Sequence, residues 1–214
     1  MAKKIQIDFV SDVVCPWCAI GLKGLETALE KLDGEVEAEL HFQPFELNPQ
    51  MAPEGEDRDA HIARKYGQTR EQTAAVRERI RERAASVGFT MSNAQDHIYN
   101  TFDAHRLLHW AGLEGKQLAL KDKLLLAYFT EGLNISDREV LVKKAAEAGL
   151  DPKAARDVLE SGRYAEDVRQ EEQSWINAGI SSVPAVIVNR QYLISGGQPP
   201  EVFEESLRQI AAKI

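Results

Sequence analysis

The sequence predicts an α/β fold with a large all-helical insertion, and two observations carry this prediction. Alternating apolar and polar residues, which are typical of strands, lie near the two ends of the 214-residue chain. Between residues 58 and 177 nearly every apolar pattern has helical spacing, and glycines break it into several helices. The chain therefore begins and ends in α/β structure, with a helical block between the two parts.

The N-terminal segment reads as a strand, a helix and a second strand. Residues 5–10 alternate as a half-buried strand does, and residues 36–42 alternate again. Apolar residues between these strands repeat at helical spacing, which predicts a helix over 18–32. Residues 48–59 contain two prolines and a glycine, and this loop is the expected domain boundary.

Local signals support short helices and a return to strands. Residues 136–139 match a capping box, and Asp151 precedes a proline at a predicted helix start. Strands are expected at 185–189 and 191–195, followed by a helix after Pro199 and Pro200. We therefore divide the chain into a first part of the α/β domain, an inserted helical domain and a second part of the α/β domain, at 1–50, 51–178 and 179–214.

Cys15-Pro16-Trp17-Cys18 holds both cysteines of the chain and lies where the first strand becomes a helix. Free backbone N–H groups and the dipole at a helix start favour a thiolate, so Cys15 is the expected nucleophile. Cys18 lies one turn deeper and could attack a mixed disulfide on Cys15 as the resolving thiol. Pro16 suits the first helical turn, and Trp17 offers an apolar surface beside the sulfur. A structural zinc site needs four ligands, and the sequence has no second cysteine pair.

A second segment supports a redox site. Val183 and Pro184 follow a small-residue turn and precede an apolar run that reads as a buried strand. Proline lacks a ladder donor, so it suits the first residue of a strand, and a proline that closes a tight turn can be cis. Spacing alone leaves both peptide isomers open.

Five motifs resemble the DsbA-like oxidoreductases of the thioredoxin superfamily, specifically the FrnE type, over nearly the whole chain. They are SDVVCPWCAIG at 11–21, PFELNP at 44–49, NTFDAHRL at 100–107, SVP at 182–184 and GGQ at 196–198. The resemblance implies a thioredoxin-like fold with a large inserted all-helical domain. It also implies that Pro184 is cis and faces the cysteines, and that the Val183 backbone binds an extended substrate. Better-known members carry a histidine where Trp17 stands, which stabilises the thiolate, so the net direction stays open.

Composition narrows the setting of the protein. Its 43% hydrophobic and 28% charged residues suffice for a large core, and a net charge of −8 argues against general nucleic-acid binding. The N-terminus enters a strand without the features of a signal peptide, and no apolar run has the length of a membrane span. We therefore expect a cytoplasmic protein, where a lone Cys-x-x-Cys pair is more plausibly catalytic than structural.

The leading hypothesis is a protein disulfide oxidoreductase whose substrate is a disulfide-containing protein or a small thiol. The two sulfurs carry the electrons, so we expect no bound cofactor, although glutathione could be a cosubstrate. The first alternative is a glutathione-dependent isomerase or kappa-class transferase, whose fold the chain resembles but which typically has serine where Cys15 stands. The second is a binding protein whose helical lobe holds unfolded chains or a partner. Both a monomer and a homodimer remain open.

Other polar and aromatic residues fit structural roles better than chemical ones. His105 and His109 stand four apart on a predicted helix, where packing or surface roles are favoured over a metal site or substrate contact, so no metal is expected. The arginine-rich segment 64–83 is interspersed with glutamates and reads as a solvated helix, with a site for an anionic partner as the alternative. Four aromatic residues are expected in the core of the helical domain, with an apolar groove facing the active site as the alternative for some of them: Trp110, Tyr128, Phe129 and Trp175.

Overall fold

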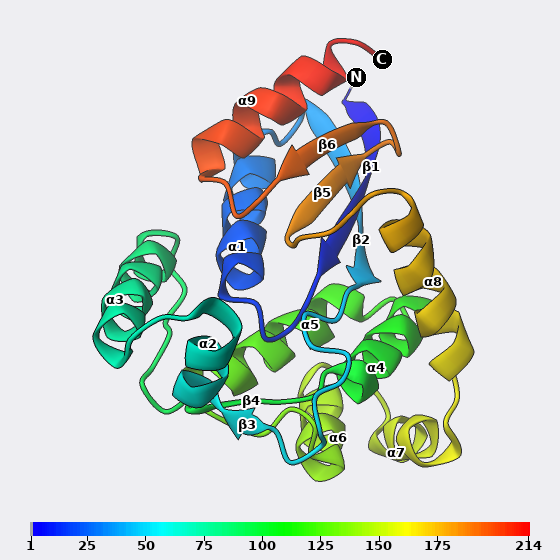
Figure 1. Ribbon diagram of the computed structural model, residues 1–214. Coiled ribbons are helices and arrows are strands. Elements are labelled where there is room, and N and C mark those ends of the chain that lie inside the picture. Colours follow the sequence, from blue (N-terminus) through cyan, green and yellow to red (C-terminus); the bar gives the residue numbers. More distant parts are fainter. Residues whose placement is uncertain (1) are drawn as a thin grey trace.

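A computed structural model describes residues 2–214 and shows one four-stranded sheet built from both ends of the chain (Figure 1). Its strands, in the order β2-β1-β5-β6, are β2 (Val36–Pro44), β1 (Lys3–Ser11), β5 (Ala185–Val188) and β6 (Tyr192–Ser195). The first two strands run parallel, and β5 is antiparallel to both β1 and β6. The predicted α/β fold is therefore confirmed, and its sheet contains both parallel and antiparallel strand pairs.

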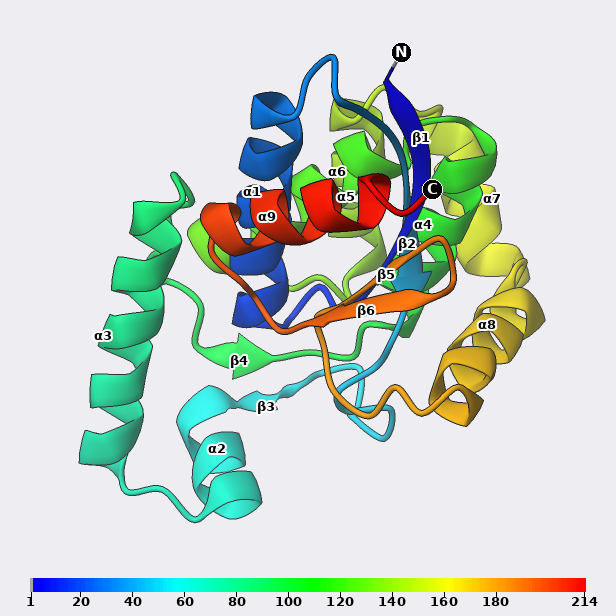
Figure 2. The same ribbon diagram turned by 90° about the horizontal axis from the view of Figure 1, so that it is seen from above.

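Helices cover both faces of this sheet. The helices α1 (Pro16–Lys31) and α9 (Pro200–Ala211) pack together on one face, over Ile7 and Phe9 of β1. The helix α8 (Ala165–Asn177) lies on the other side (Figure 2). Because both faces are covered, the polar residues in the second half of β1, Asp8 and Ser11, are also enclosed. Asp8 is fully buried and accepts a hydrogen bond from Gln43 Nε2 at 2.7 Å, which differs from the half-buried strand expected.

The segment between β2 and α8 forms a largely helical block at one end of the sheet. Its elements are β3 (Glu56–Asp57), α2 (Arg58–Tyr66), α3 (Arg70–Ser86), β4 (His97–Ile98), α4 (Phe102–Leu113), α5 (Gln117–Leu125), the π-helical turn η1 (Leu126–Thr130), α6 (Arg138–Glu147) and α7 (Pro152–Ser161). The antiparallel strands β3 and β4 escaped prediction because two residues carry no periodicity. The domain limits at 50 and 178 stay a prediction. Within residues 2–214, no helix has the length and apolar character needed to cross a membrane.

Two local predictions have different outcomes. The capping box at 136–139 is wrong, because Asp137 caps α6 by accepting from the Glu139 and Val140 backbone N–H groups, while Ser136 Oγ donates to the Pro53 carbonyl. The cap at Asp151 is confirmed.

The prediction that four aromatic residues lie in the core of the helical domain is right for three of them. Trp110, Tyr128 and Phe129 are buried in the main core, as expected. Trp175 does not join them, and it packs half-buried against the smaller apolar cluster of Val10, Ala185 and Ile187. The expectation for Trp175 was wrong because its position in α8 faces the sheet.

Candidate active site

The two cysteines lie at the start of α1, where β1 has just ended. Cys15 is the N-cap residue and Pro16 the first residue of the helix, as its spacing predicted. The Cys15 carbonyl accepts from the backbone N–H groups of Cys18 at 3.1 Å and Ala19 at 3.3 Å, which starts the helix. Both thiols are free, and their exposed fractions are 4% for Cys15 and 0% for Cys18. The motif therefore presents one thiol at the edge of the core and hides the other.

The pKa values of the two thiols are shifted in opposite directions. A hydrogen bond from the Cys18 side chain is the main cause that lowers the pKa of Cys15, and backbone N–H groups of Cys18 and Trp17 act in the same direction against burial. Burial raises the pKa of Cys18 well above its ordinary value, and the neighbouring Cys15 adds to this increase. Of the two thiols, Cys15 therefore loses its proton more readily than Cys18.

Val183 and Pro184 meet the cysteines from the opposite end of the sequence. The Cys15 thiol donates to the Val183 carbonyl oxygen at a distance of 3.7 Å. The Val183–Pro184 peptide bond is cis. A Cβ atom at Gly21 would lie 3.2 Å from Pro184 Cγ and 3.1 Å from the Cα of Gly197. Because Gly21 has no side chain, α1 can approach Pro184 and Gly197 this closely. The motifs at 11–21, 182–184 and 196–198 therefore converge on one place.

Trp17 lies beside the buried sulfurs with 42% of its surface exposed. Its backbone oxygen packs so tightly against Gly197 that a Cβ atom there would approach it to 2.7 Å. The indole is exposed, and its role as an apolar surface for a substrate stays a prediction. It carries no ionisable group that could take the place of a histidine at this position.

Next to the buried Cys18 lies a buried charged residue, Lys121, that the sequence did not reveal. Lys121 of α5 is 1% exposed, and its Nζ donates to Ser11 Oγ at 2.9 Å. Burial lowers the pKa of Lys121, while the charges of Cys18 and Asp12 oppose the shift. The positive charge of Lys121 in turn lowers the pKa of Cys18, although burial outweighs it. A lysine of the helical block is thus electrostatically coupled to the resolving thiol.

Asp12 connects the same region to α4 and to the loop after β2. Its Oδ2 accepts from the Leu47 backbone N–H at 2.8 Å, and its Oδ1 lies 3.3 Å from His105 Nε2. Both side chains are buried. His105 is therefore a packed residue that positions Asp12, which is the structural role favoured from the sequence.

The signal that could have revealed Lys121 is its place one residue after Leu120 and three before Leu124, on the apolar face of a helix.

His109 is separate from the cysteines. It lies 3.2 Å from Glu171, and that hydrogen bond raises the pKa of His109. Among the described residues, no group of three or more His, Cys, Asp or Glu side chains is placed to hold a metal ion.

Known proteins with this arrangement identify the family. Residues 6–208 match the DSBA-like thioredoxin domain. The chain belongs to this family. A probable DsbA oxidoreductase of Streptomyces coelicolor is 34% identical and superposes with a TM-score of 0.92, over 98% of this chain and 91% of that one. The family fold, with its inserted helices, is therefore shared by a solved structure across nearly its whole length.

Two further relatives extend the comparison of the DSBA-like domain. The uncharacterized protein YwbO of Bacillus subtilis strain 168 is 29% identical over 204 residues, which cover 95% of this chain and 96% of that protein. The cytosolic disulfide reductase DsbM of Pseudomonas aeruginosa superposes with a TM-score of 0.64 over 98% of this chain and 100% of its own, at 17% identity. At that identity the likeness shows the fold alone.

Proposed function

We propose that the protein is a thiol:disulfide oxidoreductase in which Cys15 is the nucleophile and Cys18 the resolving thiol. The Cys15 thiolate attacks one sulfur of a substrate disulfide, the substrate S–S bond breaks, and one thiolate leaves. Cys18 then loses its proton and attacks Cys15 Sγ, which releases the second substrate thiolate and forms the Cys15–Cys18 disulfide. The substrate gains two electrons and the enzyme loses them, and the reverse sequence oxidises a dithiol.

The observation that carries this proposal is the placement of two free thiols one helical turn apart, with Cys15 at the N-cap of α1 and Cys18 fully buried behind it. The opposite directions of their pKa shifts agree with this placement. A pair that merely fills the core would not need one sulfur stabilised as a thiolate by N–H groups at a helix start. The Val183 carbonyl beside Cys15 supports the second part of the proposal. We assign the backbone there to an extended substrate chain and Pro184 to the wall that faces the sulfurs.

The setting of the reaction belongs to the same proposal. The motifs at 11–21 and 100–107 support a FrnE-type member of the family. The reaction needs no bound organic cofactor, since the two sulfurs carry the electrons, and glutathione is a suitable cosubstrate for returning the enzyme to its starting state. We place the protein in the cytoplasm, where the reducing pool would keep the pair reduced and ready to attack disulfides.

Redox titration tests the proposal. The purified protein is equilibrated in glutathione buffers of graded ratio, and the state of the pair is measured by thiol alkylation and mass spectrometry. We expect a reversible two-electron transition. Its position against the cytosolic glutathione potential separates a reductase from an oxidase.

Single-cysteine variants separate the two roles. Cys15→Ser should abolish exchange with a small neutral disulfide, whereas Cys18→Ser should accumulate a mixed disulfide on Cys15. Exchange that persists in Cys15→Ser would exclude the mechanism. Glutathione-dependent isomerisation of a small aromatic substrate that survives in Cys18→Ser would instead favour the kappa-class alternative.

A further inference from the structure

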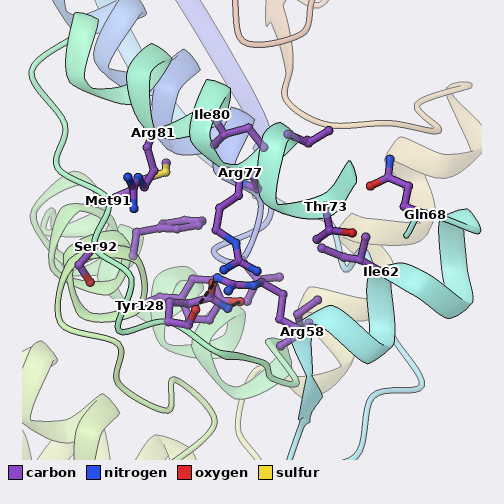
Figure 3. Close-up of a pocket in the computed structure, with 16 residues that line it drawn as sticks. Arg58, Ile62, Gln68, Thr73, Arg77, Ile80, Arg81, Met91, Ser92 and Tyr128 are labelled. Atoms are coloured by element: carbon purple, nitrogen blue, oxygen red, sulfur yellow. Dashed lines mark hydrogen bonds between the residues drawn. The ribbon is translucent and has the colours of Figure 1, made fainter. Parts of the chain in front are cut away.

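A pocket outside the cysteine pair begins next to the motif itself. It has a volume of about 150 Å³, and Val14 and Pro16, the residues on either side of Cys15, form part of its wall. Apolar side chains of α2 and α3 line another part, among which Ile62 and Ile80 are labelled in Figure 3. Val76 of α3 and four residues beyond α3 complete the apolar lining: Met91, Ile98, Tyr128 and Phe129. An apolar cavity of this volume holds one benzene-sized group. The pocket is therefore large enough for a single ring, and it meets the motif at Val14 and Pro16 and not at Cys15 itself.

The charge of this pocket is opposite to that of the protein. Three arginines line it, Arg58, Arg77 and Arg81, and none of the lining residues is an aspartate or glutamate, although the chain carries a net charge of −8. Asp59, outside the lining, pairs with Arg77 and lies 3.5 Å from Arg58 Nε. Glu78 pairs with Arg81. Two carboxylates thus serve three guanidinium groups, which leaves one positive charge without a partner among these residues.

The imbalance is concentrated at Arg58 and Arg77. Arg77 extends from α3 across the pocket toward Arg58 (Figure 3). Arg58 donates through Nη1 to the Gln95 side chain at 2.5 Å, while its buried Nε has no hydrogen-bond acceptor among residues 2–214. Burial, followed by the charge of Arg77, lowers the pKa of Arg58. Two like charges that share Asp59 in a partly buried place would be stabilised by an anion between them.

We propose that this pocket binds a small aromatic disulfide or thiol that carries a carboxylate, with the ring in the apolar pocket and the carboxylate on Arg58 and Arg77. The proposal rests on the function proposed above, because the sulfur of the same molecule lies at Cys15. The volume fits one ring rather than a folded protein surface, and the arginine pair selects the anion. The anionic-partner interpretation of the arginine-rich segment, which the sequence ranked second, thus applies to part of α3.

The reaction of such a substrate balances without further groups. The Cys15 thiolate attacks an aryl disulfide, the aryl S–S bond breaks, and one aryl thiolate leaves. Attack by Cys18 releases the second aryl thiolate, so the substrate gains two electrons and the enzyme becomes oxidised. A thiol reductant such as glutathione reduces the enzyme again and is itself oxidised.

Three disulfides test this assignment on the reduced full-length protein. Sodium 4,4′-dithiodibenzoate has a carboxylate on the ring opposite each sulfur, its dimethyl ester keeps the ring without the charge, and dithiodipropionate keeps the charge without the ring. For each disulfide, the second-order rate constant of a variant is divided by that of the wild type, which cancels the intrinsic reactivity of the disulfide.

Arg77→Gln should lower the rate constant for dithiodibenzoate at least tenfold, or about 1.4 kcal/mol, and change that for the ester less than twofold. Val76→Phe, which narrows the pocket, should slow both aromatic disulfides and leave dithiodipropionate unaffected. Arg79→Gln and Ala75→Phe are matched controls, because both residues lie on α3, are exposed and do not line the pocket. Equal losses for all three disulfides in Arg77→Gln, or losses in the controls as large as in the pocket variants, would overturn the proposal.

Binding without thiol chemistry separates this proposal from the proposed function. Benzoate titrated into Cys15→Ser, followed by NMR, should shift signals of α2 and α3, and Arg77→Gln in the same background should weaken that binding. If benzoate binds but the wild type fails to react with 2-hydroxyethyl disulfide, the oxidoreductase function fails and the pocket stands. If the wild type reacts with that neutral disulfide but benzoate does not bind, the pocket assignment is wrong.

Discussion

The acidity of Cys15 depends on the thiol of Cys18, and two single substitutions measure this dependence. The hydrogen bond from the Cys18 side chain is the largest cause that lowers the pKa of Cys15. A hydrogen bond to a charged group contributes about 1.5–3 kcal/mol, and one pKa unit corresponds to about 1.4 kcal/mol. Cys18→Ala should therefore raise the pKa of Cys15 by about one to two units. Cys18→Ser keeps a donor and should raise it much less.

Alkylation of Cys15 by iodoacetamide as a function of pH provides the assay. Each variant has a single cysteine, so the reaction reports Cys15 alone. Because thiolate is lost as the pH falls through the pKa, a higher pKa moves the midpoint of the rate profile upward. The same variants unfolded in urea give the reference, where their midpoints should coincide. Equal midpoints for folded Cys18→Ala and Cys18→Ser would refute the claim that a donated hydrogen bond sets the acidity of Cys15.

Three further predictions concern pH, charge and packing. Folding raises the pKa of Cys18, so the neutral Cys18 thiol stabilises the folded protein. This stabilisation is complete below the pKa of an unfolded thiol and is lost as the pH rises above it. In that range Cys15 is ionised in both the folded and the unfolded protein. The free energy of unfolding of the reduced protein should fall by up to about 1.4 kcal/mol per unit above pH ~8.5. Cys18→Ser, which keeps a donor to Cys15, should remove this slope in denaturant titrations. Lys121→Met removes the charge that favours the Cys18 thiolate, so a glutathione mixed disulfide on Cys15 should last roughly tenfold longer at neutral pH if that charge contributes one pKa unit; an unchanged lifetime would contradict the coupling. Gly197→Ala places a Cβ atom 2.7 Å from the Trp17 oxygen and should lower the free energy of unfolding by about 1–3 kcal/mol, and an unchanged value would show that the backbone shifts freely.

Local sequence signals were sufficient for the four strands of the main sheet and for the position of the two cysteines. Cys15 and Cys18 stand where a period of two changes to helical spacing, and the structure has a strand end and a helix start there. Pro184 likewise stands directly before the buried strand β5. Such signals act over a few residues, so one sequence is enough to read them. The proximity of Val183 to Cys15 came only from the resemblance to a family.

The polar residues behind the site could not be assembled in the same way. Lys121, Ser11 and Asp12 meet because α5 packs below the end of β1, a tertiary arrangement that no spacing encodes. The pocket presents the same difficulty. Arg77 and Arg79 look alike in the sequence, and only the packing of α2 against α3 shows that the first lines a cavity and the second faces solvent.

The sheet joins the two ends of the chain, since Ile7 of β1 is registered with Val188 of β5. A ribosome must therefore release nearly the whole polypeptide before the central strand pair can close, and contacts so distant in sequence make folding slow. During that interval both thiols are exposed to oxidants. With only two cysteines in the chain, however, a single intramolecular disulfide is possible, between Cys15 and Cys18. Premature oxidation can thus trap the newborn chain with a partner molecule, but it cannot scramble the chain itself.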